Sequence, residues 1–155
     1  MSFLHSGALL LARLRDACPG FAGRVFSAAD MAGVQERDQL TPAVHLVLDR
    51  YQPVGRSGSG ETRWNEHWIA VVVVKNVARD DRQMAQTADA ATLAGEVLAA
   101  LDGWSWRDAG GTHLVECHPA PAPLFTDSHA YFPLGFILNT ASLQASPLIG
   151  RNRPG

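Results

Sequence analysis

The closest match to a chemical motif is the glycine-rich stretch Gly55–Thr62, which reads GRSGSGET. Its glycine spacing is that of a phosphate-binding loop, in which backbone N–H groups surround the phosphates and a lysine clamps them. Glu61 occupies the lysine position, and a carboxylate there repels phosphate. The stretch also lies between two predicted strands, whereas the motif requires a helix whose N-terminus faces the anion. We therefore interpret it as a hairpin loop and expect no nucleotide to bind.

Side chains of metal-binding types gather around residue 115, where His113, Cys117 and His118 lie close in sequence. A structural zinc site needs four ligands. On a strand, His113 and Cys117 face one side and His118 the other, so each face holds too few. Cys18 or His129 would have to join them, and nothing in the spacing requires this. We expect core and surface roles here, and no metal.

Motifs for nucleophilic catalysis are also missing from the sequence. Ser59 lies between two glycines, but the strand-to-helix turn of a nucleophile elbow is absent. Asp80 and Asp81 are explained by the start of a helix, where carboxylates meet the positive end of the helix dipole. We therefore expect no catalytic or cofactor-binding residue, and a protein that is not an enzyme.

Tryptophan is frequent for a chain of this size, with four residues. Trp68 lies inside an apolar run and is expected in the core. Trp104 and Trp106 lie beside turns, and aromatic side chains in such places are enriched at protein interfaces. They are candidates for contact with a partner, although local packing would explain them as well.

The composition places these residues in one folded domain. The chain has 155 residues, 46% of them hydrophobic and 18% charged, with a formal net charge of -2. This balance argues against disorder, and it does not favour sequence-specific nucleic-acid binding. Cys18 and Cys117 are both expected as buried thiols rather than as a disulfide, which fits a reducing compartment. The N-terminus lacks signal-peptide features, and the apolar run Trp68–Val74 is too short to cross a bilayer. We expect a cytoplasmic protein without membrane contact.

The periodicity of apolar residues predicts the elements that position these side chains. Apolar residues at helical spacing predict a helix over Gly7–Ala17 and another from Asp80 to about Leu101, ended by Gly103. Runs of β-branched and apolar residues predict strands. They cover Arg24–Ser27 (short), Ala43–Tyr51, Arg63–Asn76, Thr112–His118 and Ala130–Thr140, with a loop over Gln52–Glu61 and an extended linker at Pro119–Pro123.

This order predicts an α+β fold with a single mixed or antiparallel sheet of about four to five strands and two main helices on one face. Consecutive valines from Val71 to Val74 indicate burial on both faces of the sheet. We expect the following residues to be largely buried: Val47, Ile69, Val71, Val73, Leu98 and Phe136. Helices would cover one face, and a neighbouring subunit is a candidate for the other. We expect a single domain over residues 1–142 and a flexible C-terminal tail over residues 143–155.

The arrangement resembles the tail terminator proteins of long-tailed phages, especially those of Mu-like phages and prophages. The matching features are the helix Leu9–Ala17, the strand that begins PAVHLVL at Pro42, the strand WIAVVVV at Trp68, and the helix that ends LAALDGW at Trp104. The closing strand YFPLGFIL at Tyr131 completes them. The resemblance spans residues 5–141.

The resemblance implies a structural subunit without a cofactor. Such subunits form a ring, expected to be a hexamer, which caps the tail tube, stops its polymerisation and provides the surface that joins the head. The implied partners are further copies of the chain, the tail tube protein and a head-completion or connector protein. The implied locations are the host cytoplasm during assembly and then the virion tail. The interface residues we expect are Arg56, Arg63, Trp64, His67, Trp104 and Trp106.

Two other classes of function remain open from sequence. One is another head–tail connector or completion protein with a similar fold and a different neighbour. The other is a small nucleotide-binding enzyme or hydrolase, which a bound ligand or metal in the purified protein would reveal.

Overall fold

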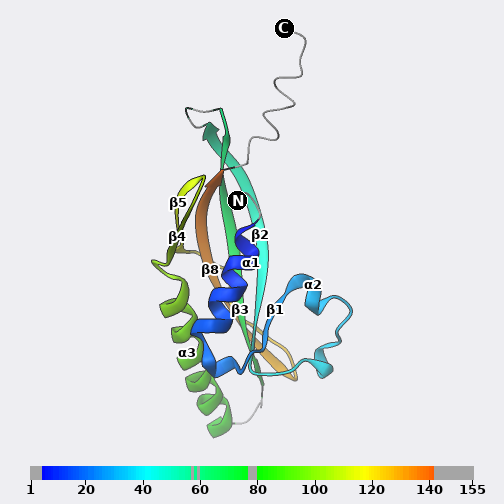
Figure 1. Cartoon of the computed structure of the whole chain (residues 1–155). Helices are drawn as coiled ribbons and strands as arrows, with labels where there is room; N and C mark the ends of the chain where they lie inside the picture. Colours follow the sequence, from blue (N-terminus) through cyan, green and yellow to red (C-terminus); the bar gives the residue numbers. More distant parts are fainter. Residues whose placement is uncertain (1–4, 57, 59, 77–79, 142–155) are drawn as a thin grey trace.

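A mixed sheet of six strands runs through the molecule, with the main helices on one of its faces (Figure 1). The computed structural model describes residues 5–56, 58, 60–76 and 80–141. The sheet has the strand order β1-β2-β3-β8-β6, and β7 pairs with β8 beside β6. Its strands are β1 (Val25–Ser27), β2 (Ala43–Arg56), β3 (Thr62–Lys75), β6 (Glu116–His118), β7 (Leu124–Phe125) and β8 (His129–Ala141). The expected α+β class and mixed main sheet are confirmed, and this sheet has six strands where about four to five were expected.

The remaining elements are helices and a small hairpin. The α-helices are α1 (Ser6–Ala17), α2 (Ala28–Met31) and α3 (Asp80–Leu101), and the 3₁₀ helices are η1 (Pro19–Phe21) and η2 (Glu36–Asp38). The strands β4 (Ser105–Asp108) and β5 (Gly111–Leu114) form a separate two-stranded sheet. Gly103, with φ +82°, follows α3 and fulfils the expected role of ending this helix.

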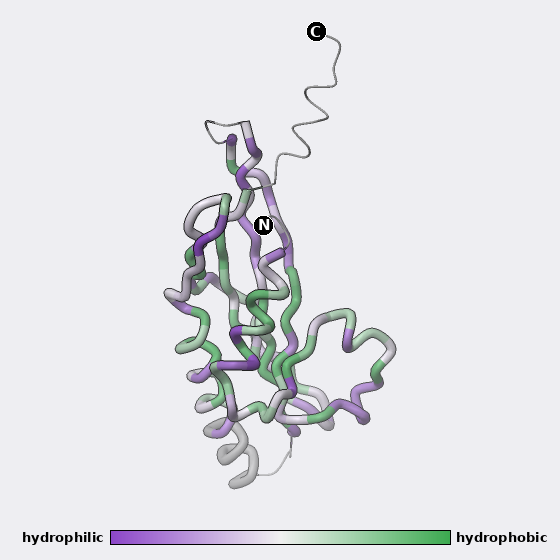
Figure 2. The backbone as a smooth tube through the Cα atoms, in the orientation of Figure 1, coloured by the Kyte–Doolittle hydropathy of each residue, from purple (hydrophilic) through white to green (hydrophobic). Residues whose placement is uncertain are grey.

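Strands β2 and β3 form one long antiparallel hairpin, paired from Ala43 with Val73 to Arg56 with Thr62. The expected loop over Gln52–Glu61 is therefore wrong for its first half. Pro53 and Gly55 indicated a loop, but an edge strand tolerates proline where no N–H is needed, and a register shift between these two residues absorbs the irregularity. The hairpin becomes more polar towards its end (Figure 2).

Strand β8 pairs with β3 along its whole length, from Ala141 beside Arg63 to His129 beside Lys75. The predicted strand Thr112–His118 is divided in two at Val115. The N–H of Val115 donates to Trp104, and its carbonyl accepts from Gly103. These two hydrogen bonds attach Val115 to the segment that follows α3. Before Val115, strand β5 pairs with β4, and after it, strand β6 pairs with β8.

The hydrophobic core lies between the sheet and the helices α1 and α3 (Figure 1). The core includes Leu10 and Leu14 of α1, and Val97 and Leu101 of α3, all with 0% exposure. The sheet contributes its facing residues, which include Val44, Leu46, Trp68, Ala70, Val72, Phe136 and Leu138.

The buried stripe of α3 differs from the expected one. The helical spacing of apolar residues predicts a stripe of Ala88, Ala91, Ala94, Leu98 and Leu101, widened by Leu93 and Val97. Val97 and Leu101 are buried as predicted, but Leu98 is 36% exposed and Ala91 is exposed. The buried residues are Ala90, Val97, Ala100 and Leu101. Both sets of residues fit a helical period. Because alanine is frequent all around this helix, its packing partners determine which face is buried.

The second face of the sheet is less deeply covered than the core face. Val47, Ile69 and Val71, expected to be buried, are only half-buried because they point to this second face. Val73 and Phe136 are buried as expected, at 0% and 1% exposure.

Both cysteines are free, and Cys18 is buried as expected. Cys117 is exposed, which corrects the expectation of a buried thiol. It lies in the short strand β6 at the edge of the sheet, where nothing described covers it fully. No described helix is long and apolar enough to cross a membrane. The proposed tail, residues 143–155, lies outside the described residues.

Candidate functional site

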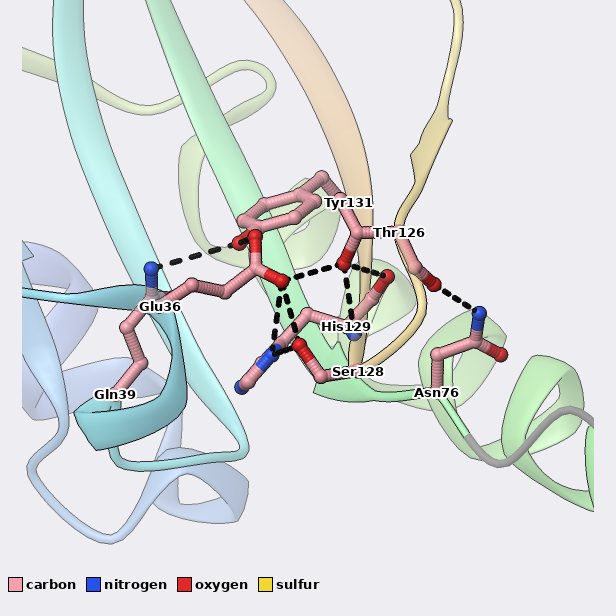
Figure 3. Close-up of polar contacts among 7 residues, drawn as sticks. All are labelled: Glu36, Gln39, Asn76, Thr126, Ser128, His129 and Tyr131. Atoms are coloured by element: carbon pink, nitrogen blue, oxygen red, sulfur yellow. Dashed lines mark hydrogen bonds and ion pairs between the residues drawn. The ribbon is translucent and has the colours of Figure 1, made fainter.

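The densest polar cluster surrounds the carboxylate of Glu36 in η2 (Figure 3). Its Oε1 accepts hydrogen bonds from the hydroxyls of Thr126 at 2.6 Å and Ser128 at 2.5 Å, and its Oε2 accepts one from Tyr131 at 2.9 Å. The Nδ1 of His129 lies 3.7 Å from Oε1. All four partners belong to the turn between β7 and β8 or to the start of β8. We call these five residues the Glu36 cluster.

Hydrogen bonding controls the ionisation of this cluster. The hydroxyls of Ser128, Thr126 and Tyr131 stabilise the charged carboxylate and lower the pKa of Glu36 to about 2. Burial raises the pKa of Tyr131, and its hydrogen bond to Glu36 raises it further. The carboxylate is therefore ionised at neutral pH and joins η2 to a part of the chain about ninety residues away.

The presence of Glu36, His129 and Ser128 together suggests a catalytic triad, but the geometry is different. In a triad, histidine uses one ring nitrogen for the serine and the other for the carboxylate. Here Nδ1 of His129 lies near both Ser128 and Glu36, while the serine hydroxyl donates directly to the carboxylate. The Nε2 atom of His129 is buried without a hydrogen-bond partner among the described residues. The cluster therefore differs from a triad in its arrangement, and it holds two segments of the chain together.

The segment held by the Glu36 cluster forms one wall of a cleft of about 420 Å³. Asp38, Gln39 and Leu40 line it from this side, and Gln39 also donates to the Tyr131 hydroxyl at 3.4 Å. The other walls are the end of α1, strand β1 and the segment after it. They contribute Arg15, Gly23, Val25, Phe26, Asp30, Met31 and Val34. The cleft is apolar inside and carries two carboxylates.

A second polar cluster is fully buried, around Glu66 in β3. Its carboxylate accepts hydrogen bonds from Ser6 of α1, from the indole of Trp68 at 2.9 Å and from Thr140 of β8 at 2.6 Å. Glu66 is 0% exposed. A buried carboxylate with three donors is satisfied, and it fixes the start of α1 on the sheet.

His67 lies on the opposite face of the same strand and forms a pair with His118 of β6. The ring centroids are 4.7 Å apart and the ring planes are inclined at 63°. Neither ring nitrogen of His67 has a hydrogen-bond partner among the described residues. Burial lowers the pKa of His67, and the nearby positive charges of Arg50 and His118 lower it further, while Asp49 opposes them. His67 is 5% exposed, so it offers only a small surface of its own to a partner.

Three expected interface residues lie towards the end of the β2–β3 hairpin. Arg56 is exposed and donates to the Gly60 carbonyl at 3.1 Å. Arg63 is engaged by Asn139 of β8, at 2.8 Å from its Nε. Trp64 packs edge-on against Tyr51, with centroids 5.7 Å apart. Of the three, Arg56 is the most available to a partner.

The other two candidates, Trp104 and Trp106, pack mainly within the chain. Their rings lie 5.1 Å apart, Arg13 of α1 stacks over Trp104 at 5.4 Å, and Trp106 contacts His113 at 5.3 Å. Both are half-buried against the core. Trp106 is linked to Arg63 and Trp64 through His113 and Asn139, because His113 lies 2.9 Å from the Asn139 carbonyl and the Asn139 side chain bonds to both hairpin residues.

The metal-type side chains are also dispersed. His113 is buried, with its ring nitrogens 2.8 Å from Asp108 and 2.9 Å from the Asn139 carbonyl, so it attaches the β4–β5 hairpin to β8. Cys117 is exposed, and His118 contacts His67. Within the described part of the chain, no group of three or more histidine, cysteine or acidic residues is placed to hold a metal.

The sequence did not reveal the Glu36 cluster or the cleft. The stretch Ala28–Gln39 has no clear period, and the partners of Glu36 are remote in sequence. The only available signal was the group Thr126, Ser128 and His129 directly before a predicted strand, since hydroxyl residues in turns often bond locally.

Comparisons with known proteins agree with this description. A model of the family described as "Phage tail terminator protein" matches residues 1–142. A chain of the solved structure titled "Virion of native gene transfer agent (GTA) particle" has a similar fold, with a TM-score of 0.59 and 17% sequence identity. The match covers 91% of this chain and 100% of that one. No curated protein sequence matches at a significant level.

Proposed function

Since the chain belongs to the phage tail terminator family, we propose that it is the ring-forming subunit that caps a tail tube in a phage or prophage. In this proposal, copies of the chain close into a ring, most simply a hexamer, that stops tube polymerisation and provides the surface to which the head joins. The family match over residues 1–142 carries the proposal. The role is structural and requires no catalytic residue.

Two features of the fold support ring formation. A ring needs two different surfaces on each subunit that meet head to tail. Strand β2 is exposed from Asp49 to Arg56, beyond the part that pairs with β1, so it offers an open sheet edge. The half-buried apolar residues Val47, Ile69 and Val71 add contact area on the face away from the helices.

The β2–β3 hairpin is the part we propose to reach the tube. It extends to one end of the molecule, beyond α1 and α3 (Figure 1). Its end is polar and carries the exposed Arg56, whose guanidinium donates to the Gly60 carbonyl within the hairpin. We keep Arg56, Arg63 and Trp64 as proposed tube-contact residues, and His67, Trp104 and Trp106 as proposed contributors to the interface between subunits.

The test of the function uses tail tubes assembled from the cognate tube protein. The purified chain should decorate tube ends, seen by electron microscopy, and should shorten tubes when present during polymerisation. Mass photometry of the released caps should give six copies of the 16.7 kDa chain. Unchanged tube length and bare tube ends would show that the chain is not a terminator. Binding to the head side alone would instead identify a connector.

A further inference from the structure

We propose that the cleft beside η2 binds the C-terminal segment Pro147–Arg153 of a neighbouring copy of the chain. The cleft is the one lined by residues of α1, β1 and the segment 28–40, described above. The inference rests on the proposed ring, because it needs a second copy at short distance. It names the contact that joins one subunit to the next.

The cleft has the features of a peptide-binding groove. Its volume of about 420 Å³ lies in the range of small-ligand and side-chain pockets, roughly 300–1,000 Å³. Its apolar lining includes Met31, Val34 and Leu40, and the last two are 40% and 64% exposed. Large aliphatic side chains exposed around one concavity lose contact with water when a partner fills it.

The segment Pro147–Arg153 has a sequence that matches this groove. It reads PLIGRNR, with the adjacent apolar residues Leu148 and Ile149 followed by Arg151 and Arg153. Residues 142–155 include no aspartate or glutamate, so the side chains of this part of the chain carry a net charge of +2. Apolar side chains would fill the cleft, and the two guanidinium groups would reach its rim.

The rim carries the opposite charge. Asp30 and Asp38 line the cleft, and the segment 28–40 contains three acidic residues and one basic residue. Hydrogen bonds from Ser27 lower the pKa of Asp30, so this carboxylate is ionised at neutral pH. The side chain of Asp38 is 66% exposed. Arginine forms strong paired hydrogen bonds with such carboxylates. Arg15 also lines the cleft, where it donates to the Val25 carbonyl at 3.1 Å and lies near Asp30, so it offsets one of the two negative charges and the lining keeps one acidic charge in excess.

The geometry of the sheet prevents Leu148 from reaching the cleft of its own chain. The described chain ends at Ala141, which pairs with Arg63, whereas β1 beside the cleft is level with Val72 of β3. Nine residues of strand separate Arg63 from Val72, which is roughly 30 Å. The displacement from β8 to β1 across three strand spacings adds roughly 14 Å sideways. Seven extended residues from Ala141 to Leu148 span at most about 25 Å, so Leu148 falls short.

The Glu36 cluster gives this groove a fixed shape. It attaches η2 to the start of β8, and η2 leads directly into Gln39 and Leu40 of the cleft wall. A wall held by three hydrogen bonds to one carboxylate does not need to be ordered when the segment binds, which lowers the entropic cost of docking.

Disulfide trapping tests the contact in the full-length chain. The exposed Cys117 is first replaced by serine, and Cys18 stays because it is buried. The pair Val34→Cys and Leu148→Cys should then form covalent dimers and higher oligomers under mild oxidation, on non-reducing gels. The pair Leu40→Cys and Leu148→Cys should crosslink in the same way from the other wall of the cleft. It tests the contact even if the Val34 variant folds poorly.

The matched control is Val54→Cys with Leu148→Cys. Val54 is 47% exposed, similar to Val34, but it lies near the end of β8, within reach of Leu148 of the same chain. We expect its oligomer yield to be at least tenfold lower. Equal yields, crosslinks within single chains for the Val34 pair, or no crosslink in either cleft pair would overturn the proposal.

A charge reversal tests the rim separately. Arg151→Asp with Arg153→Asp should lower the crosslinking yield about tenfold, and adding Asp38→Arg should recover much of it. The trapping is done both in solution and on tube ends. If the unmodified chain caps tubes but the cleft pairs give no oligomers, only the docking proposal fails. If the unmodified chain caps no tubes, the proposed function fails, whatever the crosslinking result.

Discussion

At the scale of single residues, Glu36 shows how one ionised side chain connects distant segments. Its three hydroxyl donors lie at residues 126, 128 and 131, and all three bonds stabilise the charged form. The energy of these bonds is therefore linked to pH.

We predict that Glu36→Gln lowers the melting temperature at pH 7 and that the difference disappears in acid. The folded-state pKa of Glu36 is about 2, below its ordinary value of 4.5. The stabilisation is therefore complete above about pH 4.5 and is lost as pH falls towards 2. Thermal melts of both proteins between pH 2.5 and 7 measure it. Asp38→Asn is the control for the loss of one negative charge from η2. A constant difference between Glu36→Gln and the native chain across this range would contradict the assignment.

His67 makes a second contribution to the pH dependence of stability. As for Glu36, this contribution is lost as the pH falls, but over a higher pH range. Burial and the charges of Arg50 and His118 lower its pKa below 6.5, so the unfolded chain takes up this proton more readily than the folded one. Stability contributed by neutral His67 is thus present above about pH 6.5 and declines below it.

Replacing His67 by phenylalanine should remove this dependence. Phenylalanine fills a similar volume and leaves no buried ring nitrogen without a partner. We predict that His67→Phe is stabilised relative to the native chain, more at pH 5 than at pH 7.5, in urea denaturation. The control is His5→Phe at an exposed position. A gain that is the same at both pH values would show that His67 titrates normally.

At the scale of elements, local patterns predicted most of the sheet and missed what depends on partners. Valines and other apolar residues placed both β3 and β8 to within one residue at each end. The continuation of β2 through Pro53 and Gly55 was missed, because only the pairing with β3 shows that an edge strand tolerates them. The division at Val115 likewise depends on hydrogen bonds to the end of α3, which no local pattern encodes.

The helix α3 gives an element-scale prediction from two leucines three residues apart. Leu101 is 0% exposed in the core, whereas Leu98 is 36% exposed. Leu101→Ala should lower the free energy of unfolding by about 2–5 kcal/mol, because it leaves a cavity. Leu98→Ala should change it by less than about 1 kcal/mol. Urea denaturation of both variants decides this, and a larger cost at Leu98 would restore the stripe expected from sequence.

At the scale of the whole molecule, the functional inference came from the order of elements and not from a chemical motif. The site is harder to predict, because an assembly surface needs no particular residue type at a fixed spacing. Trp104 and Trp106 were reasonable candidates by residue type, yet they pack against Arg13 and His113 of the same chain. The cleft was not foreseen, because its walls come from α1, β1 and η2, which only the fold brings together.

The end of the molecule that faces the tube can be identified with two basic residues at opposite ends of the β2–β3 hairpin. Arg56 lies at the end of β2, where the hairpin turns, and Lys75 ends β3 at the other end of the sheet. Both are exposed, so reversing their charge should leave the melting temperature nearly unchanged. If the hairpin end contacts the tube, Arg56→Glu should weaken tube-end binding at least tenfold, and Lys75→Glu should have little effect. Because an exposed charge acts mainly through long-range attraction, the loss should be larger at low salt. The reverse pattern, with Lys75→Glu defective and Arg56→Glu normal, would place the opposite end of the sheet against the tube and turn the hairpin towards the head.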